Sequence, residues 1–427
     1  MAKSKLTMVT AVTVVILTAV AFVNAKTTVE GKGSTIEQMV NSDKVPEAAQ
    51  KLKSDYRFDN PDGLHAVRQF SLLVLRRGLK ETDPYERCYA ASALGANGDE
   101  GSVKILEAAF SSPDPGLKMA AVDGLGDMGN GIAAASFQRL YHTADAYGKR
   151  LLVSGLGQVN HPQAITLLVV AAGESDGDTR MLAVEALGRL HDTDALPQLH
   201  KLMAIEEQPY NKIMVAHSML LLGDNSGIAT LLRVARESNN SDYRAAAIMA
   251  LADARDASVA GELKKGLADP DPEVRIAAAG ALTHYNDDEG LAVLRTAMEA
   301  DDSHTRSEVG QLLEHLDYSV AKATVLASLS SPDPGLRLAG THALGLFGGE
   351  QAVDPLTDSL HTTSDPIMRA DIAWALGRIA GPRCIDPLMG MVIETDPAVR
   401  YTAADALART SNRLLDHTAD SANKSHP

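Results

Sequence analysis

Cysteine is nearly absent from this chain of 427 residues, which contains only Cys88 and Cys384. Two cysteines so far apart cannot form the dense disulfide framework of a small secreted domain. They also have neither the paired spacing of a zinc site nor a C-x-x-C-H haem signature. The fold must therefore be held together by its apolar core, and 45% hydrophobic residues supply enough of it.

Recognisable catalytic and ligand-binding motifs are missing as well. The sequence has no H-E-x-x-H, no G-x-S-x-G and no phosphate-binding glycine loop, and its thirteen histidines are scattered. Acidic turns such as residues 287–289 fit helix caps better than calcium ligands. We therefore predict a protein that is not an enzyme and that has no cofactor and no metal site.

Positive charge is in short supply, with 40 Lys and Arg against 55 Asp and Glu and a formal net charge of −15. Loss of the first 25 residues removes Lys3 and Lys5 and makes the charge −17. Nucleic-acid binding needs clustered Lys and Arg, so we exclude it. The acidic balance suits a basic partner, although it also serves ordinary solubility. We expect the partner to be a protein or peptide, and the sequence leaves the oligomeric state open.

Long hydrophobic runs are absent except at the start of the chain. Lys3 and Lys5 precede an uncharged, largely apolar stretch over residues 6–23, which ends in small residues at Ala25. This pattern predicts a secretory signal peptide cleaved after Ala25, with an uncleaved signal anchor as the alternative. In both cases the body of the protein is exported and lies in the periplasm or another extracytoplasmic space. Membrane contact, if there is any, is expected only through this segment.

The rest of the chain is organised by a repeat of 31–32 residues. In its clearest copy, Asp271 and Pro272 start a helix that continues through Arg275 to Leu282. Asp271 can cap the first turn, and proline is favoured at the first helical position. The basic residue four places after the cap recurs in eleven units. Its positions are Arg87, Lys118, Lys149, Arg180, Lys212, Arg244, Arg275, Arg306, Arg337, Arg369 and Arg400.

Each unit reads as two short helices. The first helix follows the capping residue and is rich in alanine, and the second helix is richer in Leu, Ile and Val. No strand-like alternation runs through the units. A pair of short helices cannot bury its apolar faces alone, so the pairs must stack in sequence order.

The basic residue in the first turn of the first helix needs a partner, because the helix dipole disfavours a cation there. We predict a structural ladder in which it pairs with the capping aspartate of an adjacent repeat. A ligand-binding row of arginines is the alternative. The predicted ladder consists of Asp83, Arg87, Asp114, Lys118, Asp271, Arg275, Asp333, Arg337, Asp365, Arg369, Asp396 and Arg400.

The form Asp-Pro-x-x-Arg-x-x-Ala-Ala-x-Ala-Leu-Gly resembles the short HEAT-like repeat first associated with phycobilisome lyases. Residues 365–377 match it closely, and the resemblance covers residues 64–412. It implies an all-α, right-handed α-solenoid, an α-α superhelix of armadillo type with about eleven helix pairs. It also implies that the second helices line a concave face, which such repeats usually offer to protein partners.

These patterns divide the chain into four parts. Residues 1–25 are the signal peptide or anchor, 26–63 a polar N-terminal segment and cap, 64–412 the repeat array and 413–427 a disordered tail. Residues 64–79 fit the second helix of an incomplete repeat, and we expect residues 35–79 to cap the array. Trp374, the only tryptophan, is either a core residue or an exposed anchor for a partner.

The second helices carry the residues that we predict to bind a partner. Their charge is basic or mixed in the middle of the chain and acidic toward the C-terminus. The candidates are Gln198, Lys201, Arg233, Arg236, Lys264, Lys265 and Asp358. We hypothesise an exported scaffold that docks an extended protein or peptide in a concave groove. The alternatives are merely solvated faces, a lyase-like enzyme or cofactor-handling protein, and a structural envelope protein.

Overall fold

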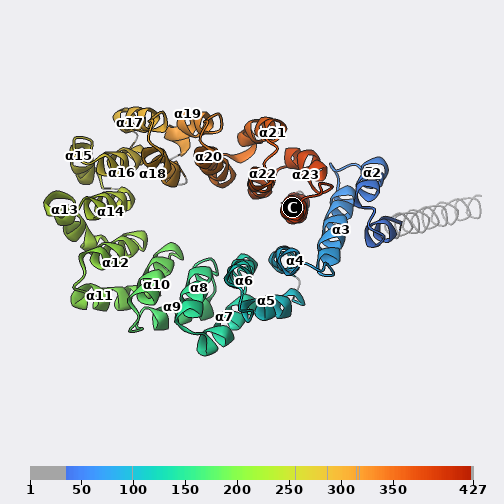
Figure 1. Ribbon diagram of the computed structural model, residues 1–427, viewed down its shortest axis with the longest axis horizontal. Coiled ribbons are helices and arrows are strands. Elements are labelled where there is room, and N and C mark those ends of the chain that lie inside the picture. The colour runs from blue at the N-terminus through green and yellow to red at the C-terminus, as the bar shows by residue number, and fades with distance from the viewer. Residues whose placement is uncertain are drawn as a thin grey trace, which may run out of the picture.

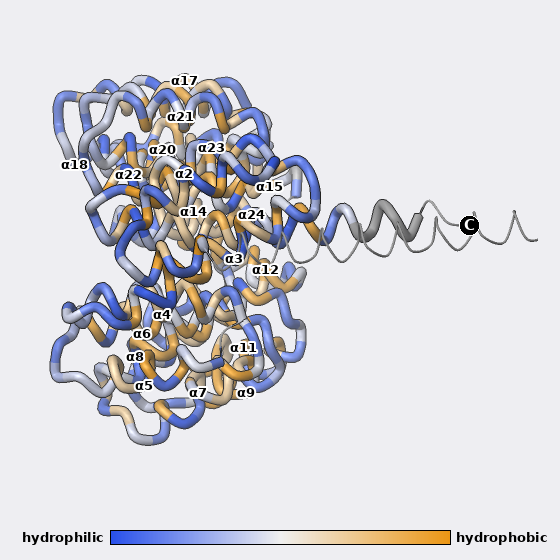
Figure 2. The backbone as a smooth tube through the Cα atoms, turned by 90° about the vertical axis from the view of Figure 1, so that its right-hand side faces the viewer, coloured by the Kyte–Doolittle hydropathy of each residue, from blue (hydrophilic) through white to orange (hydrophobic). Residues whose placement is uncertain are grey.

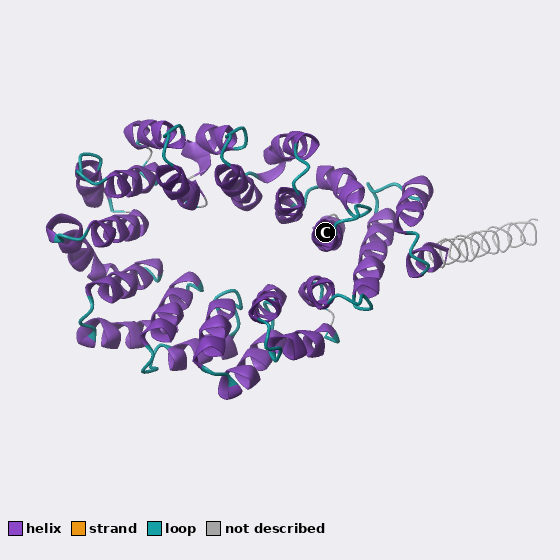
Figure 3. Ribbon diagram, in the orientation of Figure 1, coloured by secondary structure: helices purple, strands orange, loops and turns teal. Residues whose placement is uncertain are grey.

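The computed structural model describes residues 35–424, apart from Asp99, Arg255, Asn286, Glu314 and Asp317. Helices and connecting turns make up this described part, and it contains no strand (Figure 3). Residues 35–41 are helical and are followed by α2 (Val45–Asp55) and α3 (Pro61–Gly78). The predicted signal peptide lies outside the described residues.

The first helices begin where the sequence predicts them. The Asp83 carboxylate accepts hydrogen bonds from the backbone amides of Tyr85 and Glu86, and a proline occupies the first turn. Gln208, which replaces the aspartate in the fifth unit, makes no such side-chain bond. The first helices are α4 (Pro84–Ala96), α6 (Pro115–Met128), α8 (Ala146–Leu156), α10 (Gly177–Arg189), α12 (Pro209–Leu221), α14 (Ser241–Leu251), α16 (Pro272–Thr283), α18 (Ser303–Leu313), α20 (Pro334–Phe347), α22 (Pro366–Ile379) and α24 (Pro397–Lys424).

The second helices pack against the first helices through Leu, Ile, Val and Phe side chains such as Leu106, Phe137 and Leu168. Figure 2 shows mostly hydrophilic turns at the outer edges of the stacked helix pairs and hydrophobic segments between these turns. Short 3-10 turns precede several of these helices. The second helices are α5 (Ser102–Phe110), α7 (Gly131–Thr143), α9 (Pro162–Ala171), α11 (Leu196–Ile205), α13 (Ile228–Glu237), α15 (Ala257–Gly266), α17 (Asp288–Met298), α19 (Tyr318–Ser328), α21 (Val353–Thr362) and α23 (Ile385–Met391).

The helix pairs stand side by side in a wall that closes into a ring, with the first helices inside and the second helices outside (Figure 1). The expectation that the second helices line the concave face is therefore wrong for this chain. The cause is side-chain size. Small residues let the first helices approach closely, and a Cβ atom added at Gly377 of α22 would lie 2.6 Å from the Ala406 Cβ atom of α24. The bulkier second helices keep the outer layer wider.

The ring closes because the last first helix shares the N-terminal helix. α24 packs between α22 and α4, and it makes its most extensive contact with α3. α3 occupies the outer position that a second helix following α24 would fill (Figure 1). The incomplete first repeat and the incomplete last repeat thus complete each other. We call the junction of α24 with α3 and α4 the seam.

The seam has an apolar centre and a polar margin. Tyr401 of α24 is 2% exposed, and its ring lies 2.7 Å from the point that a Cβ atom on Gly78 would occupy. The same buried cluster contains Leu75, Leu94 and Leu407, so the core is continuous across the seam. At the margin, the Asn97 Nδ2 atom donates to the Asp405 Oδ1 atom at 2.7 Å.

Two expectations about the ends of the array are corrected. α3 is not a polar cap, because its apolar residues are covered by α24 and by α2. Residues 413–424, which the sequence predicts to be a disordered tail, continue α24 as a helix to Lys424. Cys88 and Cys384 are both buried and free, so closure of the ring does not join them.

Candidate functional site

The basic residues of the predicted ladder bind backbone carbonyl groups in the turn just before their own helix. The Arg275 Nη1 atom donates to the carbonyl oxygens of Asp269 and Pro270 at 2.8 and 2.9 Å. The cation thus neutralises carbonyl dipoles of the turn, which offsets the unfavourable helix dipole. The same pair of acceptors, five and six residues back, serves Arg87, Arg180, Arg306 and Arg337.

Several of these cations also reach an acidic residue of the next repeat, two positions before its cap. Arg244 forms a two-pronged pair with Asp269 at 2.8 and 3.0 Å, whereas the cap of that repeat is Asp271. Lys149 pairs with Glu174 at 2.9 Å. The same arrangement joins Arg180 to Glu206 and Arg369 to Glu394. These pairs tie consecutive first helices together along one edge of the ring.

The sequence therefore predicted the basic residues of the ladder correctly, but the acids that pair with most of them are not the predicted capping aspartates. The Arg306 Nε atom does reach a neighbour's cap, Asp333, at 2.9 Å. Most caps accept hydrogen bonds from amides of their own first turn, and in several repeats an acid two positions earlier pairs with the neighbouring repeat instead. Lys118 donates to the Phe110 carbonyl at 3.0 Å. The caps that accept from their own helix are Asp83, Asp114, Asp271, Asp333, Asp365 and Asp396.

A basic residue of the ladder also reaches an acid across the seam, although at another position of the repeat. Arg400 of α24 approaches Glu86 of α4 at 3.8 Å, so an ion pair joins the last repeat to the first. This contact supports the view that α4 follows α24 in the ring as α24 follows α22.

The predicted partner-binding residues lie on the outer layer, not on the concave face. Arg236 and Lys265 both pair with Glu262, at 2.8 and 2.7 Å, and they lower the pKa of Glu262 to about 2. Lys264 pairs with Asp287 at 2.6 Å. These three cations therefore serve contacts within and between outer helices. Arg233 and Asp358 are exposed on the same layer, and their partner-binding role stays a prediction.

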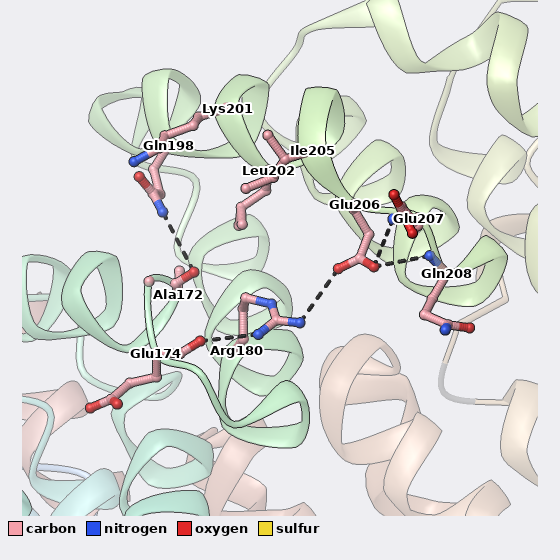
Figure 4. A pocket seen from close by; sticks show the side chains of 11 residues that line it. Ala172, Glu174, Arg180, Gln198, Lys201, Leu202, Ile205, Glu206, Glu207 and Gln208 are labelled. Carbon is pink, nitrogen blue, oxygen red and sulfur yellow. Dashed lines mark hydrogen bonds and ion pairs between the residues drawn. The ribbon is translucent and has the colours of Figure 1, made fainter.

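Gln198 and Lys201 line an outer cavity of about 440 Å³ between α11 and the turns before α10 and α12 (Figure 4). Its polar groups are mostly bonded to one another. Arg180 donates to the Glu174 carbonyl at 3.0 Å and pairs with Glu206 at 3.6 Å. The Gln198 Nε2 atom donates to the Ala172 carbonyl at 3.5 Å. Because these groups satisfy one another, we assign no ligand to this cavity.

A second cavity, of about 430 Å³, lies on the inner layer beside the seam, and we call it the inner seam cavity. Its walls come from α4, α6, α22 and α24, and they combine aromatic rings with carboxylates. Tyr89 and Met119 contribute exposed apolar surface, with 45% and 50% of each residue accessible. The lining residues are Tyr85, Cys88, Tyr89, Ser92, Ala93, Gly116, Met119, Ala120, Asp123, Asp127, Trp374, Tyr401, Thr402 and Asp405.

The carboxylates of this cavity differ in how well they are neutralised. The Arg409 Nε atom lies 2.9 Å from both oxygens of Asp405, whereas Arg409 approaches Asp127 at only 4.0 Å. Neighbouring protein atoms displace water from Asp127 and raise its pKa to about 6, although 46% of the side chain is exposed. The positive charge of Arg409 opposes this rise in pKa. Loss of hydration also raises the pKa of Asp123. The cavity therefore holds two acids on α6 with little counter-charge.

Trp374 is neither a full core residue nor a free anchor. It is half-buried at the edge of the inner seam cavity. Its ring lies 4.9 Å from the His342 ring, and the Arg378 guanidinium lies 5.9 Å from its centre. The neighbouring His342 Nε2 atom is 3.0 Å from Asp371. The indole thus contacts its own neighbours and also lines the cavity.

Sequence reasoning missed the inner seam cavity for two reasons. It assigned the concave face to the second helices, and the seam brings α4 beside a helix about three hundred residues away. One local signal was available. Tyr89 and Met119 fall outside the buried positions of α4 and α6, and exposed apolar residues on a helix indicate a contact surface.

Within the described residues, no group of three or more His, Cys, Asp or Glu side chains is placed to hold a metal ion. His217 of α12 pairs with Asp253 at 2.8 Å, and His304 of α18 approaches Glu273 at 3.4 Å. These histidines link neighbouring repeats. No helix of residues 35–424 is both long and apolar enough to cross a membrane.

Comparison with known proteins agrees with the repeat architecture. The sequence model of HEAT repeats matches residues 72–147, 133–220, 228–314, 299–377 and 362–424. Comparison with curated proteins gives no match.

Among solved structures, the chain is similar to the complex of CpcE and CpcF of phycocyanin lyase from Nostoc sp. PCC7120. The identity is 18%, the match covers 60% of this chain and 94% of the other, and the TM-score is 0.36. It is also similar to human deoxyhypusine hydroxylase, with 22% identity, 75% and 99% coverage and a TM-score of 0.31. For Kap121p bound to Pho4p, the values are 11%, 81% and 47%, and 0.31.

Proposed function

Because this chain belongs to the HEAT-repeat family, we propose that it is an exported, non-enzymatic scaffold that binds a protein or peptide along the inner face of its ring. The inner face replaces the outer residues of the sequence-based hypothesis as the main binding surface.

The observation that supports it most is the distribution of exposed apolar side chains. Large exposed hydrophobic residues mark interaction surfaces when they gather on one face, and tyrosine is enriched at binding hot spots. Most such residues in the described part of the chain lie on first helices, which form the inner layer. They are Tyr85, Tyr89, Met119, Tyr147, Tyr210, Leu346, Phe347 and Ile367, against Val170, Ile205 and Ile393 elsewhere.

Export is supported by the N-terminal sequence, in which Lys3 and Lys5 precede an apolar stretch that ends in small residues at Ala25. A scaffold role without catalysis is supported by the missing motifs and by the use of His217 and His342 in contacts with the next repeat. N-terminal sequencing of the protein recovered from a fractionated cell tests the export step. We expect the chain to begin at Lys26 in the extracytoplasmic fraction.

Site-specific photocrosslinking tests the binding face. p-Benzoylphenylalanine is introduced at Met119 on the inner helix α6 or, as a matched control, at Arg233 on the outer helix α13. Both positions are exposed, so the reagent has similar access to solvent. We expect a reproducible adduct with one partner from position 119 in cells, and none from position 233.

The adduct should disappear when Tyr85→Ala and Tyr89→Ala are added, because these rings form the adjoining surface. An adduct from position 233 alone would place the partner on the outer layer and contradict the proposal. Absence of a reproducible adduct from both positions would contradict a binding role.

A further inference from the structure

We propose that the inner seam cavity binds a lysine or arginine side chain of an extended segment of the partner protein. This inference rests on the proposed function and names the chemistry that the partner presents. The inner seam cavity has a volume of about 430 Å³, which lies within the range of roughly 300–1,000 Å³ that is usual for ligand sites.

The charge of the cavity selects a cation. Its described lining contains three carboxylates and no cationic side chain. The charged groups around it are Asp114, the cap of α6, Asp123 and Asp127 on α6, Arg378 on α22, and Arg400, Asp405 and Arg409 on α24. Asp114 accepts a hydrogen bond from the Tyr85 hydroxyl, and Arg400 lies against the Tyr401 ring and approaches Glu86. Arg409 neutralises Asp405, and Arg378 lies against the indole of Trp374. Asp123 and Asp127, one helical turn apart, therefore remain for an incoming positive charge.

The aromatic lining selects a cation with an apolar stem. Tyr89 is 45% exposed and Tyr85 38%, so their rings are accessible beside the two carboxylates. Aromatic faces attract ammonium and guanidinium groups, and Met119 offers apolar surface to a methylene chain. A hard divalent metal ion would use mainly the carboxylates, whereas a lysine or arginine side chain would use the carboxylates, the aromatic faces and the apolar surface.

The surroundings of the cavity favour an extended chain over a small free cation. Exposed apolar residues continue beyond it in both directions along the inner layer, with Ile367 on α22 and Tyr147 on α8. Both stand two positions after their caps, as Tyr85 does, so the three lie at the same level of their helices. A peptide that places one basic residue in the cavity can cover this band with its neighbouring side chains.

Trp374 provides the readout, because it is the only tryptophan and it lines the cavity. Its fluorescence is followed while the full-length mature protein is titrated with an acetylated, amidated pentapeptide that has one central lysine between leucine and glycine residues. Matched peptides carry arginine, norleucine or glutamate at the centre, and spermidine serves as a small cation. We expect saturable changes with the lysine and arginine peptides, and at least roughly tenfold weaker binding of the norleucine and glutamate peptides.

The double variant Asp123→Asn/Asp127→Asn should weaken the lysine peptide by at least roughly tenfold. Asp178→Asn provides the matched control, because Asp178 is an exposed acid of the inner helix α10 outside the cavity. It should leave binding unchanged. In the unmodified protein, binding should also weaken as the pH falls through about 6, where Asp127 takes up a proton. This second measurement holds even if the double variant folds poorly.

Equal binding of the norleucine peptide, or full binding by the double variant, would overturn the inference. Spermidine binding as tightly as the lysine peptide would overturn the choice of a peptide. A crosslinked partner at position 119 combined with no lysine selectivity would refute this inference and leave the proposed function standing. Lysine selectivity without any crosslinked partner would contradict the proposed function and leave only the preference of the cavity for a lysine or arginine side chain.

Discussion

One buried aromatic side chain, that of Tyr401, lies at the centre of the seam that closes the ring. Tyr401 is 2% exposed, and its ring and the Ala90 Cβ atom of α4 both lie 2.7 Å from the point that a Cβ atom on Gly78 of α3 would occupy. Replacing a buried aromatic residue by alanine typically costs about 3–5 kcal/mol, because it removes apolar contacts and leaves a cavity. At about 1.4 kcal/mol for each factor of ten, Tyr401→Ala shifts the balance between closed and open rings by roughly 100-fold to several thousand-fold.

The control is Ile276→Ala, at the same position of the repeat in α16. Ile276 is 4% exposed and belongs to an ordinary part of the wall. Its loss costs about 2–5 kcal/mol, so both variants melt at lower temperature. Only Tyr401→Ala is expected to separate α24 from α3 and α4 below the melting temperature.

The assay is the distance between two spin labels on either side of the seam, attached at Lys104→Cys of α5 and Asp386→Cys of α23. Both positions are exposed. The native thiols of Cys88 and Cys384 label slowly, because burial raises the pKa of each to about 11. A closed ring gives one narrow distance, and Tyr401→Ala should add a broad, longer component. A narrow distance in both variants would refute the reasoning about Tyr401.

Three further predictions concern the ion pairs between repeats, the titration of Asp127 and the glycines of the wall. Arg244→Ala should lower the free energy of unfolding in a denaturant titration by about 1.5–3 kcal/mol, because it removes a two-pronged pair that is largely shielded from water. Lys264→Ala, which removes an exposed pair, should lower it by less than about 1 kcal/mol. Asp127 has a folded-state pKa of about 6, above the ordinary value near ~3.9, so the folded state binds more protons between these values. Its contribution to stability should therefore fall as the pH rises from about 4 to about 6, and Asp127→Asn should flatten this part of the melting profile. Gly78→Ala should broaden the seam distance whereas Gly266→Ala should not, since a Cβ atom at 78 meets the Tyr401 ring and one at 266 meets Ala278 and Ile248 within the wall.

The repeat and its helices were predictable because they depend on local chemistry. Asp271 caps α16, and Pro272 begins it, as the sequence indicates. The expected helix over residues 64–79 is α3, which spans Pro61–Gly78. Caps, prolines and the spacing of apolar residues act within about one helical turn, so a single sequence reveals them.

The shape of the array was not predictable in the same way. The curvature of stacked repeats is a sum of small rotations between neighbours, and a slight change at each of the ten junctions between the eleven units decides whether the ends meet. The bond between Asn97 and Asp405 joins residues 308 positions apart, and no local pattern announces it. The inner seam cavity could not be predicted for the same reason, because two of its walls come from α4 and α6 and the other two from α22 and α24.

Closure also changes what the ends of the array require. In an open stack the terminal repeats have one neighbour and need a polar outer face. Here α3 buries Leu64, Val67 and Phe70, and its apolar residues are covered by α24 and α2. α3 cannot complete its core until α24, the last helix of the chain, has been made. The inner seam cavity therefore exists only in the complete and closed chain, and Trp374, which lines it, reports closure as well as binding. A ligand that contacts both α6 and α24 must stabilise the closed ring, so its binding and the seam distance are thermodynamically coupled.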